Sequence, residues 1–249
     1  MEDCISKQET THKEQLTYLL LLPLQIAGAE AEREKDFEEA FRKRLKFQKQ
    51  NDWKRYRASV DLLDDTEYAI ISGFEYQLGD INNQNRDIGE IFLRLYGILN
   101  AVYLQMSAFK EIANLLNYNS GEKISENFER LDIYRLRNIA AAHTVDFRYD
   151  KEFQSKYGIK KSTSFRIIQS CLEKTGSYIL AQDENDIRLE FNLLKALTEY
   201  EKRATELLVE LIHHTIKTLV HKKEDKNEVR RRLDELLPYL PDYGKMNKN

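Results

Sequence analysis

The amino-acid sequence predicts an all-α protein, a helical bundle with long helices toward both ends. Glycine and proline are scarce, at nine and three of 249 residues, and 33% of the chain is charged, a composition that favours long helices over a sheet. Apolar residues recur at spacings of three and four through the longest segments, which is the pattern of an amphipathic helix. Two short segments, 177–181 and 187–191, flank a polar turn and add one small β-hairpin to the prediction.

The first half of the chain divides into helices and one loop. Residues 16–28 are the most apolar stretch but too short to span a bilayer, and Pro23 predicts a buried helix that is kinked or interrupted there. Residues 29–56 are expected to form one long, highly charged helix. Another helix is expected at 60–78, before a loop rich in Gly and Asn at 79–85.

The second half begins with the most regular apolar pattern in the chain. Residues 86–117 predict the central helix of the bundle, with Tyr103 and Met106 in the core. Ser125 is a candidate N-cap for the helix that follows. Further helices are expected at 165–174, 192–222 and 229–237.

Charge and cysteine content narrow the function classes. The net charge is −3, so a nucleic-acid site must be a local patch rather than a property of the whole molecule. The two cysteines are too few for a disulfide framework or a zinc site. The five histidines show no HxxxH or HExxH spacing. We therefore expect a reduced, cytoplasmic protein with no metal site, no cofactor and no membrane partner.

One basic stretch is a candidate for binding RNA. Between residues 42 and 57 most charges are positive, and aromatic residues are interleaved with them. Basic groups contact phosphates and aromatic rings stack on unpaired bases. The alternative is a solvated helix whose aromatic residues face the core. The candidate RNA-binding residues here are Arg42, Lys43, Arg44, Lys46, Lys49 and Trp53.

A second candidate site lies near the middle of the chain, where Arg137, Asn138 and His143 fall within two helical turns. Arginine keeps its charge and matches the geometry of a phosphate. Histidine titrates near neutral pH and can transfer protons. Together they could cleave RNA without a metal, with the ribose 2′-hydroxyl as nucleophile and a cation stabilising the charge that develops on the phosphate oxygens.

Arg137-Asn138, followed by four residues and then His143, resembles the Arg-Asn…His motif of HEPN domains (higher eukaryote and prokaryote nucleotide-binding). The resemblance implies a helical bundle that forms a homodimer, so that two motifs make one composite site. It also implies a metal-independent endoribonuclease of the toxin or antiviral-defence kind, with RNA as substrate. An antitoxin or a nucleotidyltransferase is the partner protein that such a system would have.

The resemblance also assigns roles and boundaries. His143 would move protons, Arg137 would stabilise the charged transition state, and Asn138 would orient the histidine or a phosphate oxygen. Arg135 lies outside the motif register and would bind phosphate or pair with Asp132. The resemblance covers the motif helix and, more loosely, residues 59–222 as core, with 14–58 as a helical extension and 223–249 as a short helix and tail, all in one domain.

Two rival interpretations stay open. The motif can be a plain helical segment, because residues six apart on an ideal helix, such as Arg137 and His143, lie about 120° from each other around the axis. Convergence of the two side chains then needs a helix irregularity, the reach of the arginine or a second chain. The protein would otherwise be a non-catalytic helical module that binds a protein or nucleotide, or an RNA-binding protein without chemistry.

Overall fold

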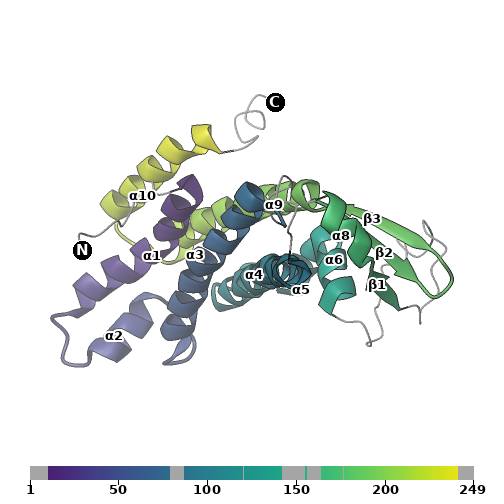
Figure 1. The fold of residues 1–249 in the computed structure, drawn as a ribbon. Helices are drawn as coiled ribbons and strands as arrows, with labels where there is room; N and C mark the ends of the chain where they lie inside the picture. The colour runs from purple at the N-terminus through teal and green to yellow at the C-terminus, as the bar shows by residue number, and fades with distance from the viewer. Residues whose placement is uncertain are drawn as a thin grey trace, which may run out of the picture.

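Helices dominate the structure, and one small sheet lies at one end of the bundle (Figure 1). The structure is a computed structural model that describes residues 11–78, 87–119, 121–141, 155, 164–175 and 177–240. The predominance of helices confirms the mainly α-helical class that the sequence predicts. The long helices are α1 (His12–Ala31), α3 (Asp52–Tyr76), α4 (Ile88–Leu115) and α9 (Leu193–Thr218), and the shorter ones are α2 (Phe37–Arg44), α5 (Gly121–Glu129), α6 (Asp132–Ala141), α8 (Gln169–Thr175), α10 (Lys223–Leu236) and the 3-10 turn η1 (Leu237–Tyr239).

The first helix begins earlier than expected and runs through its proline. Thr11 and Glu14 form a capping box, in which each side chain accepts a hydrogen bond from the other residue's backbone N–H. The helix continues past Pro23 to Ala31. Its leucines pack into the same core as α3 and α9, and this burial favours the uninterrupted helix that the sequence did not predict.

The prediction of a single charged helix at 29–56 is wrong, because the helical conformation is interrupted twice in this range. The carboxylate of Asp36 accepts a hydrogen bond from the Glu39 N–H and starts α2 afresh. After α2, Lys46 has a positive φ of 55°, and the Asp52 carboxylate accepts the Lys49 N–H before α3 begins. These turns bury Phe41, Leu45 and Phe47 and fold the acidic part of the stretch back against the basic part.

A buried polar cluster ties α1 to the other long helices. The ammonium of Lys13 lies 2.5 Å from Glu67 on α3 and 2.7 Å from Glu201 on α9. It also donates to Gln105 on α4, whose side-chain carbonyl accepts the Tyr200 hydroxyl at 2.8 Å. Burial alone would lower the pKa of Lys13, but the two carboxylates outweigh it and raise that pKa. The N-terminal helix is thereby fixed within the bundle.

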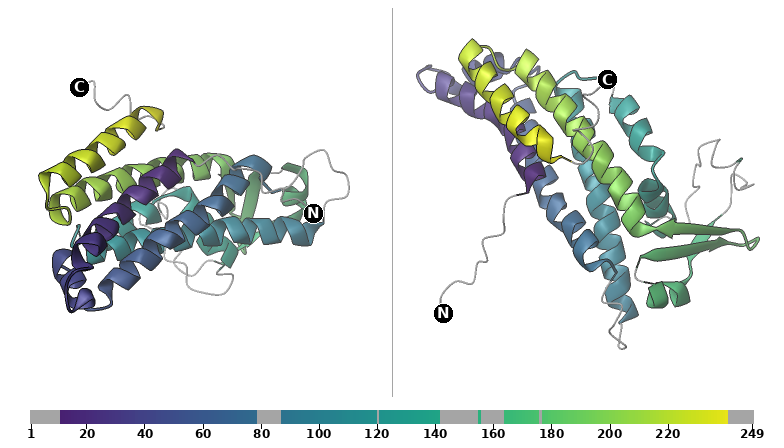
Figure 2. Two further views of the ribbon diagram at one scale, coloured as in Figure 1. Left: turned by 90° about the vertical axis from the view of Figure 1, so that its left-hand side faces the viewer. Right: turned by 90° about the horizontal axis from the view of Figure 1, so that it is seen from above.

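The helix that carries the motif is shorter than expected, since α5 and α6 are separate. The chain turns at 130–131, where the Leu131 N–H bonds the Phe128 carbonyl, and α6 starts again at Asp132. Ser125 therefore lies inside α5 rather than at a helix start. Figure 2 shows α9 and α10 alongside α1, and the sheet at the other end of α9.

The expected hairpin is confirmed and gains a third strand. Strands β2 (Tyr178–Asp183) and β3 (Arg188–Asn192) pair antiparallel, with Ile179 opposite Phe191. The segment expected as one short helix at 165–174 instead contains β1 (Phe165–Ile167), which pairs antiparallel with β2. Phe165 and Ile167 are buried while Arg166 is exposed. This alternation of buried and exposed side chains is typical of a β-strand. Helix α8 follows.

Candidate functional site around Arg137

The motif residues Arg137 and Asn138 lie on α6 at the edge of its contact with α4. The buried face of α6 consists of Ile133, Leu136, Ile139 and Ala140, which are at most 3% exposed. Arg137 follows Ile133 by four residues, so its side chain leaves the helix about 40° from Ile133, at the edge of the buried stripe. It is half-buried and held at the border between the core and solvent.

The guanidinium of Arg137 has a fixed position. Its Cζ lies 4.0 Å from the centroid of the Tyr103 ring on α4, which places the cation over the aromatic face. Its Nη1 donates a hydrogen bond to the Asn138 side-chain carbonyl at 3.0 Å. Within the residues that the structure describes, no carboxylate lies within ion-pair distance of Arg137. Among these residues, an aromatic ring and an amide orient the charge, and no acidic side chain neutralises it.

Asn138 positions the arginine. Its carbonyl oxygen accepts from Arg137, and the two N–H donors of the amide can bind a histidine or a phosphate oxygen. His143, the third residue of the motif, lies outside the described residues, and so does Ala142. The geometry between Arg137 and His143 therefore stays a prediction.

Arg135 is the neighbouring arginine outside the motif register. Its guanidinium lies 2.9 Å from the carboxylate of Asp132, and its side chain is 18% exposed. This is the ion pair that the sequence offered as one alternative. Arg135 therefore presents less free charge than Arg137.

Tyr103 was expected in the core, and that expectation is wrong. Its ring is 38% exposed, whereas Met106 is buried as expected. Phe92, Tyr96 and Tyr103 occupy positions i, i+4 and i+11 of α4, which share one face of a helix. Phe92 and Tyr96 line a groove of about 690 Å³ between α4 and the β1–α8 segment, where Arg166 is the basic residue. A helical period shows which residues share a face, but it does not show that this face meets solvent.

The first basic stretch divides into structural and exposed cations. Arg42 binds the Glu39 carboxylate through Nε and Nη2, both at 2.8 Å, and the hydrogen bond from Arg42 is the main cause that lowers the pKa of Glu39 to about 2. Arg44 donates to the Glu30 carbonyl and to Glu34. Lys43 also pairs with Glu39, at 3.3 Å, but is 69% exposed. Arg42 and Arg44 hold the fold of this stretch together.

Trp53 packs inward rather than standing free as a stacking platform. Its ring meets Phe41 edge to face, with the centroids 5.2 Å apart, and it lies against the main core. The neighbouring aromatic residues Phe47 and Tyr56 are buried. The aromatic residues of this stretch therefore follow the alternative interpretation, in which they face the core.

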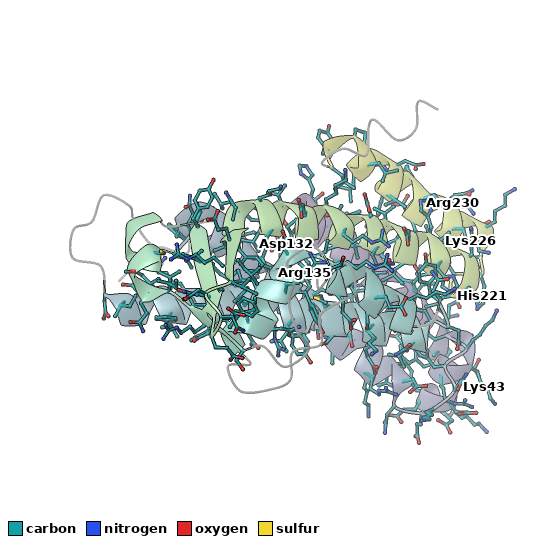
Figure 3. The ribbon with its side chains drawn as sticks, turned by 90° about the vertical axis from the view of Figure 1, so that its right-hand side faces the viewer. Lys43, Asp132, Arg135, His221, Lys226 and Arg230 are labelled. Atoms are coloured by element: carbon teal, nitrogen blue, oxygen red, sulfur yellow. The ribbon has the colours of Figure 1, made fainter. Side chains whose placement is uncertain are left out.

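Exposed cations from distant parts of the chain gather at the end of the molecule away from the sheet. In Figure 3, Lys43 lies at that end together with His221, Lys226 and Arg230, whereas Asp132 and Arg135 lie nearer the sheet. His221 Nε2 lies 2.9 Å from the Arg44 carbonyl oxygen, which joins the end of α9 to α2. We call Lys43, Lys226 and Arg230, together with Lys46 and Lys49 from the segment directly after α2, the basic end. All of these except the half-buried Lys226 are exposed. The Lys and Arg run near residues 222–232 was the sequence signal for the last two.

Three further findings concern metal binding, membrane-spanning helices and similarity to known proteins. Within the described ranges, no group of three or more His, Cys, Asp or Glu side chains is arranged to hold a metal ion. Among the same residues, no helix is long and apolar enough to cross a membrane. Comparisons with protein-family models, curated proteins and solved structures find no match for this chain.

Proposed function

We propose that this protein is a metal-independent endoribonuclease of the toxin or antiviral-defence type, acting as a homodimer. The observation that supports the proposal is the Arg137 guanidinium, which is held over Tyr103 and bonded to Asn138 without a carboxylate partner among the described residues. An oriented cation at the edge of solvent is what a charged phosphate transition state requires. The resemblance to the HEPN motif supplies the reaction.

In the proposed reaction, the 2′-hydroxyl attacks the adjacent phosphorus, and the bond from phosphorus to the 5′-oxygen breaks. His143 moves protons at the 2′-hydroxyl or at the leaving oxygen. Arg137 stabilises the negative charge on the phosphate oxygens. The products are a 2′,3′-cyclic phosphate and a 5′-hydroxyl end.

The resemblance to the HEPN motif implies the homodimer, and the spacing of the motif is consistent with it. Because Arg137 and His143 are six residues apart, a regular helix would point them about 120° from each other. A second copy that brings its own motif alongside would supply the missing direction. Within the composite site, the arginine of each protomer would then act with the histidine of the other.

We place the substrate path along α4. Tyr103 and Tyr96 are seven residues apart on one helix face, which corresponds to about 10 Å along the axis. With a phosphate on Arg137, a base one or two nucleotides away could stack on Tyr96 or Phe92, beside Arg166. Exposed aromatic residues near a free cation are the expected features of a single-strand binding path.

The test is an incubation of the purified protein with mixed RNA in EDTA, beside Arg137→Ala and His143→Ala. We expect cleavage by the wild type alone, with cyclic phosphate ends. The matched control is Arg130→Ala, which removes an exposed positive charge from the turn before α6 and should cleave normally. Full activity of His143→Ala would overturn the catalytic assignment.

Co-expression of the two inactive variants tests the composite site. If Arg137 and His143 act from different protomers, random mixing gives half heterodimers. Each heterodimer keeps one intact arginine–histidine pair of the two in a wild-type dimer, so activity returns to about a quarter of the wild type. If both residues act within one chain, no mixed dimer has an intact site and activity stays absent.

A second candidate function is RNA binding without chemistry, which the basic end favours. Its exposed cations come from α2, α10 and the segment after α2, and they would attract a polyanion without fixing its orientation. Retardation of RNA without any cleavage, lost when Lys43, Lys46 and Arg230 are replaced by Glu, would support this function instead.

A further inference from the structure

Strand β3 forms one edge of the small sheet. The strand order is β1-β2-β3, so β3 has a neighbouring strand on one side only (Figure 1). Among the described residues, no strand pairs with its other side. The edge of a sheet offers backbone donors and acceptors that can bind another extended chain.

The hydrogen bonds of the hairpin show which backbone groups of β3 point outward. The Asp183 N–H bonds the Ile187 carbonyl at 3.1 Å, and the Leu193 N–H bonds the Ser177 carbonyl at 2.8 Å. Because hydrogen-bonding residues alternate along an antiparallel strand, the odd-numbered residues of β3 direct their backbone groups toward β2. The residues whose N–H and C=O groups point outward are Arg188, Glu190 and Asn192.

Two exposed charges of opposite sign lie on this edge strand. Arg188 and Glu190 alternate with the buried Leu189 and Phe191, so both charged side chains lie on the exposed face of the sheet. Within the described part of the chain, neither takes part in an ion pair. Charges on an edge strand protect it from self-pairing when they are alike, because like charges repel across a strand pair. Alternating opposite charges do not give that protection.

The charges favour one register for pairing with a second copy of β3. Only registers that place even-numbered residues opposite each other let the outward-pointing groups form hydrogen bonds. With Leu189 on a two-fold axis, Arg188 lies opposite Glu190 of the second copy, and the reverse pair forms as well. Sliding one strand by two residues would instead place two copies of Arg188, or two copies of Glu190, opposite each other. In the first register, both charges of each strand are paired with the opposite charge.

We propose that β3 is an interaction surface for a second copy of this chain, with which it forms a continuous antiparallel sheet. The backbone groups of Arg188 and Glu190 would exchange hydrogen bonds across the axis, and their side chains would set the register. The motif helix α6 contacts β1, which lies at the opposite edge of the sheet. The proposal therefore depends neither on the ribonuclease activity nor on the homodimer proposed for it.

The experiment is sedimentation velocity of the full chain and two charge variants at about 100 μM protein and about 150 mM salt. A strand of five residues gives a small interface, so we expect a Kd on the order of 10 μM. Arg188→Glu makes both charges of the edge negative, and Glu190→Arg makes both positive. Either change should weaken the association at least about tenfold, so the average mass should fall toward half that of the wild type.

Mixing the two variants in equal amounts tests the register. Each strand of the mixed pair again meets opposite charges, so the mass should return to the wild-type value. The matched control is Glu184→Arg, which makes the same change in the exposed turn before β3 and should leave the mass unchanged. A wild type with the same mass as both variants, or a mixture that does not regain the wild-type mass, would overturn the proposal.

Hydrogen exchange gives a readout that needs no substitution. In the wild type, the amide protons of Arg188 and Glu190 should exchange about fourfold more slowly at about 100 μM than at about 1 μM protein, as the Kd above requires. The Asn192 amide also points outward but lies beyond the paired residues, so its exchange should not depend on concentration. Exchange of Arg188 and Glu190 that is independent of concentration would contradict the proposal.

Discussion

Arg137 and the basic end present two different kinds of positive charge. Arg137 is one cation, half-buried and oriented by a ring at 4.0 Å and an amide at 3.0 Å. The basic end has four lysines and an arginine, and all of them except Lys226 are exposed. An oriented charge lowers the energy of one geometry, such as a transition state, whereas mobile charges raise the local concentration of a polyanion. The number of cations in a stretch therefore indicates attraction, not chemistry.

The largest effect should come from Arg137→Lys, which keeps the charge but loses the planar guanidinium. A lysine cannot stack on Tyr103 and bond Asn138 in the same way, so the cation would lose its orientation. We expect the cleavage rate at saturating enzyme to fall about 100-fold, with RNA affinity changed less than about threefold. Single-turnover cleavage and a melting curve measure both. Wild-type cleavage by Arg137→Lys would show that charge alone suffices, and the comparison would fail.

Reversal of charge at the basic end should give the opposite profile. In the triple variant Lys43→Glu, Lys46→Glu and Arg230→Glu, we expect RNA affinity to fall about tenfold at low salt. The slope of log affinity against log salt should become shallower by about two, since each lost phosphate contact removes about 0.7 for a single strand. Binding isotherms across a salt series measure this. If the cleavage rate at saturation fell as well, the basic end and Arg137 would have to be parts of one site.

A smaller effect is expected at Tyr103. Two substitutions there distinguish the role of the ring face from that of the hydroxyl. Tyr103→Leu removes the aromatic face beneath Arg137 and should lower the cleavage rate about threefold, as expected for a partly exposed cation–π contact. Tyr103→Phe keeps the face and should cleave like the wild type. If Phe is as damaging as Leu, the hydroxyl matters and the ring does not orient the guanidinium.

Much of the fold could be predicted from the period of apolar residues, and the limits of that method are local. The central helix and the hairpin follow from spacing and turn chemistry. The break of the 29–56 segment does not, because its Glu, Lys and Arg residues are good helix formers on both sides of the turns. The burial of Phe41, Leu45 and Phe47 in the core favours the two turns. Such packing against distant parts of the chain cannot be predicted from the local sequence.

The sequence suggested a chemistry for the candidate site but not the side chains that hold it in place. The residue types and spacing of Arg137, Asn138 and His143 are the basis for proposing a phosphate site, and that assignment stays a prediction. The partner Tyr103 was assigned to the core because a helical period shows which residues share a face, not which face meets a neighbour. The same limit applied to Trp53, whose inward packing depends on α2 folding back over α3.

Arg42 should have the smallest effect on RNA, although it lies in the same basic stretch as Lys43. Its guanidinium binds Glu39 and donates to the carbonyls of Phe47 and Gln48, so it fixes the turn after α2. We expect Arg42→Gln to change RNA affinity less than about twofold. The same variant should raise the pKa of Glu39 from about 2 toward the usual carboxylate range.

The depressed pKa of Glu39 sets the direction in which its ion pair with Arg42 depends on pH. Because the folded-state pKa is depressed, the ion pair contributes stability above the ordinary carboxylate pKa and loses it as the pH falls toward 2. Carbon-detected NMR of the Glu39 carboxyl group should therefore show an ionised side chain at pH 4 in the wild type and a largely protonated one at pH 3 in Arg42→Gln. An unchanged Glu39 titration together with a large loss of RNA affinity would mean that Arg42 contacts RNA, and the basic stretch would then act as one surface.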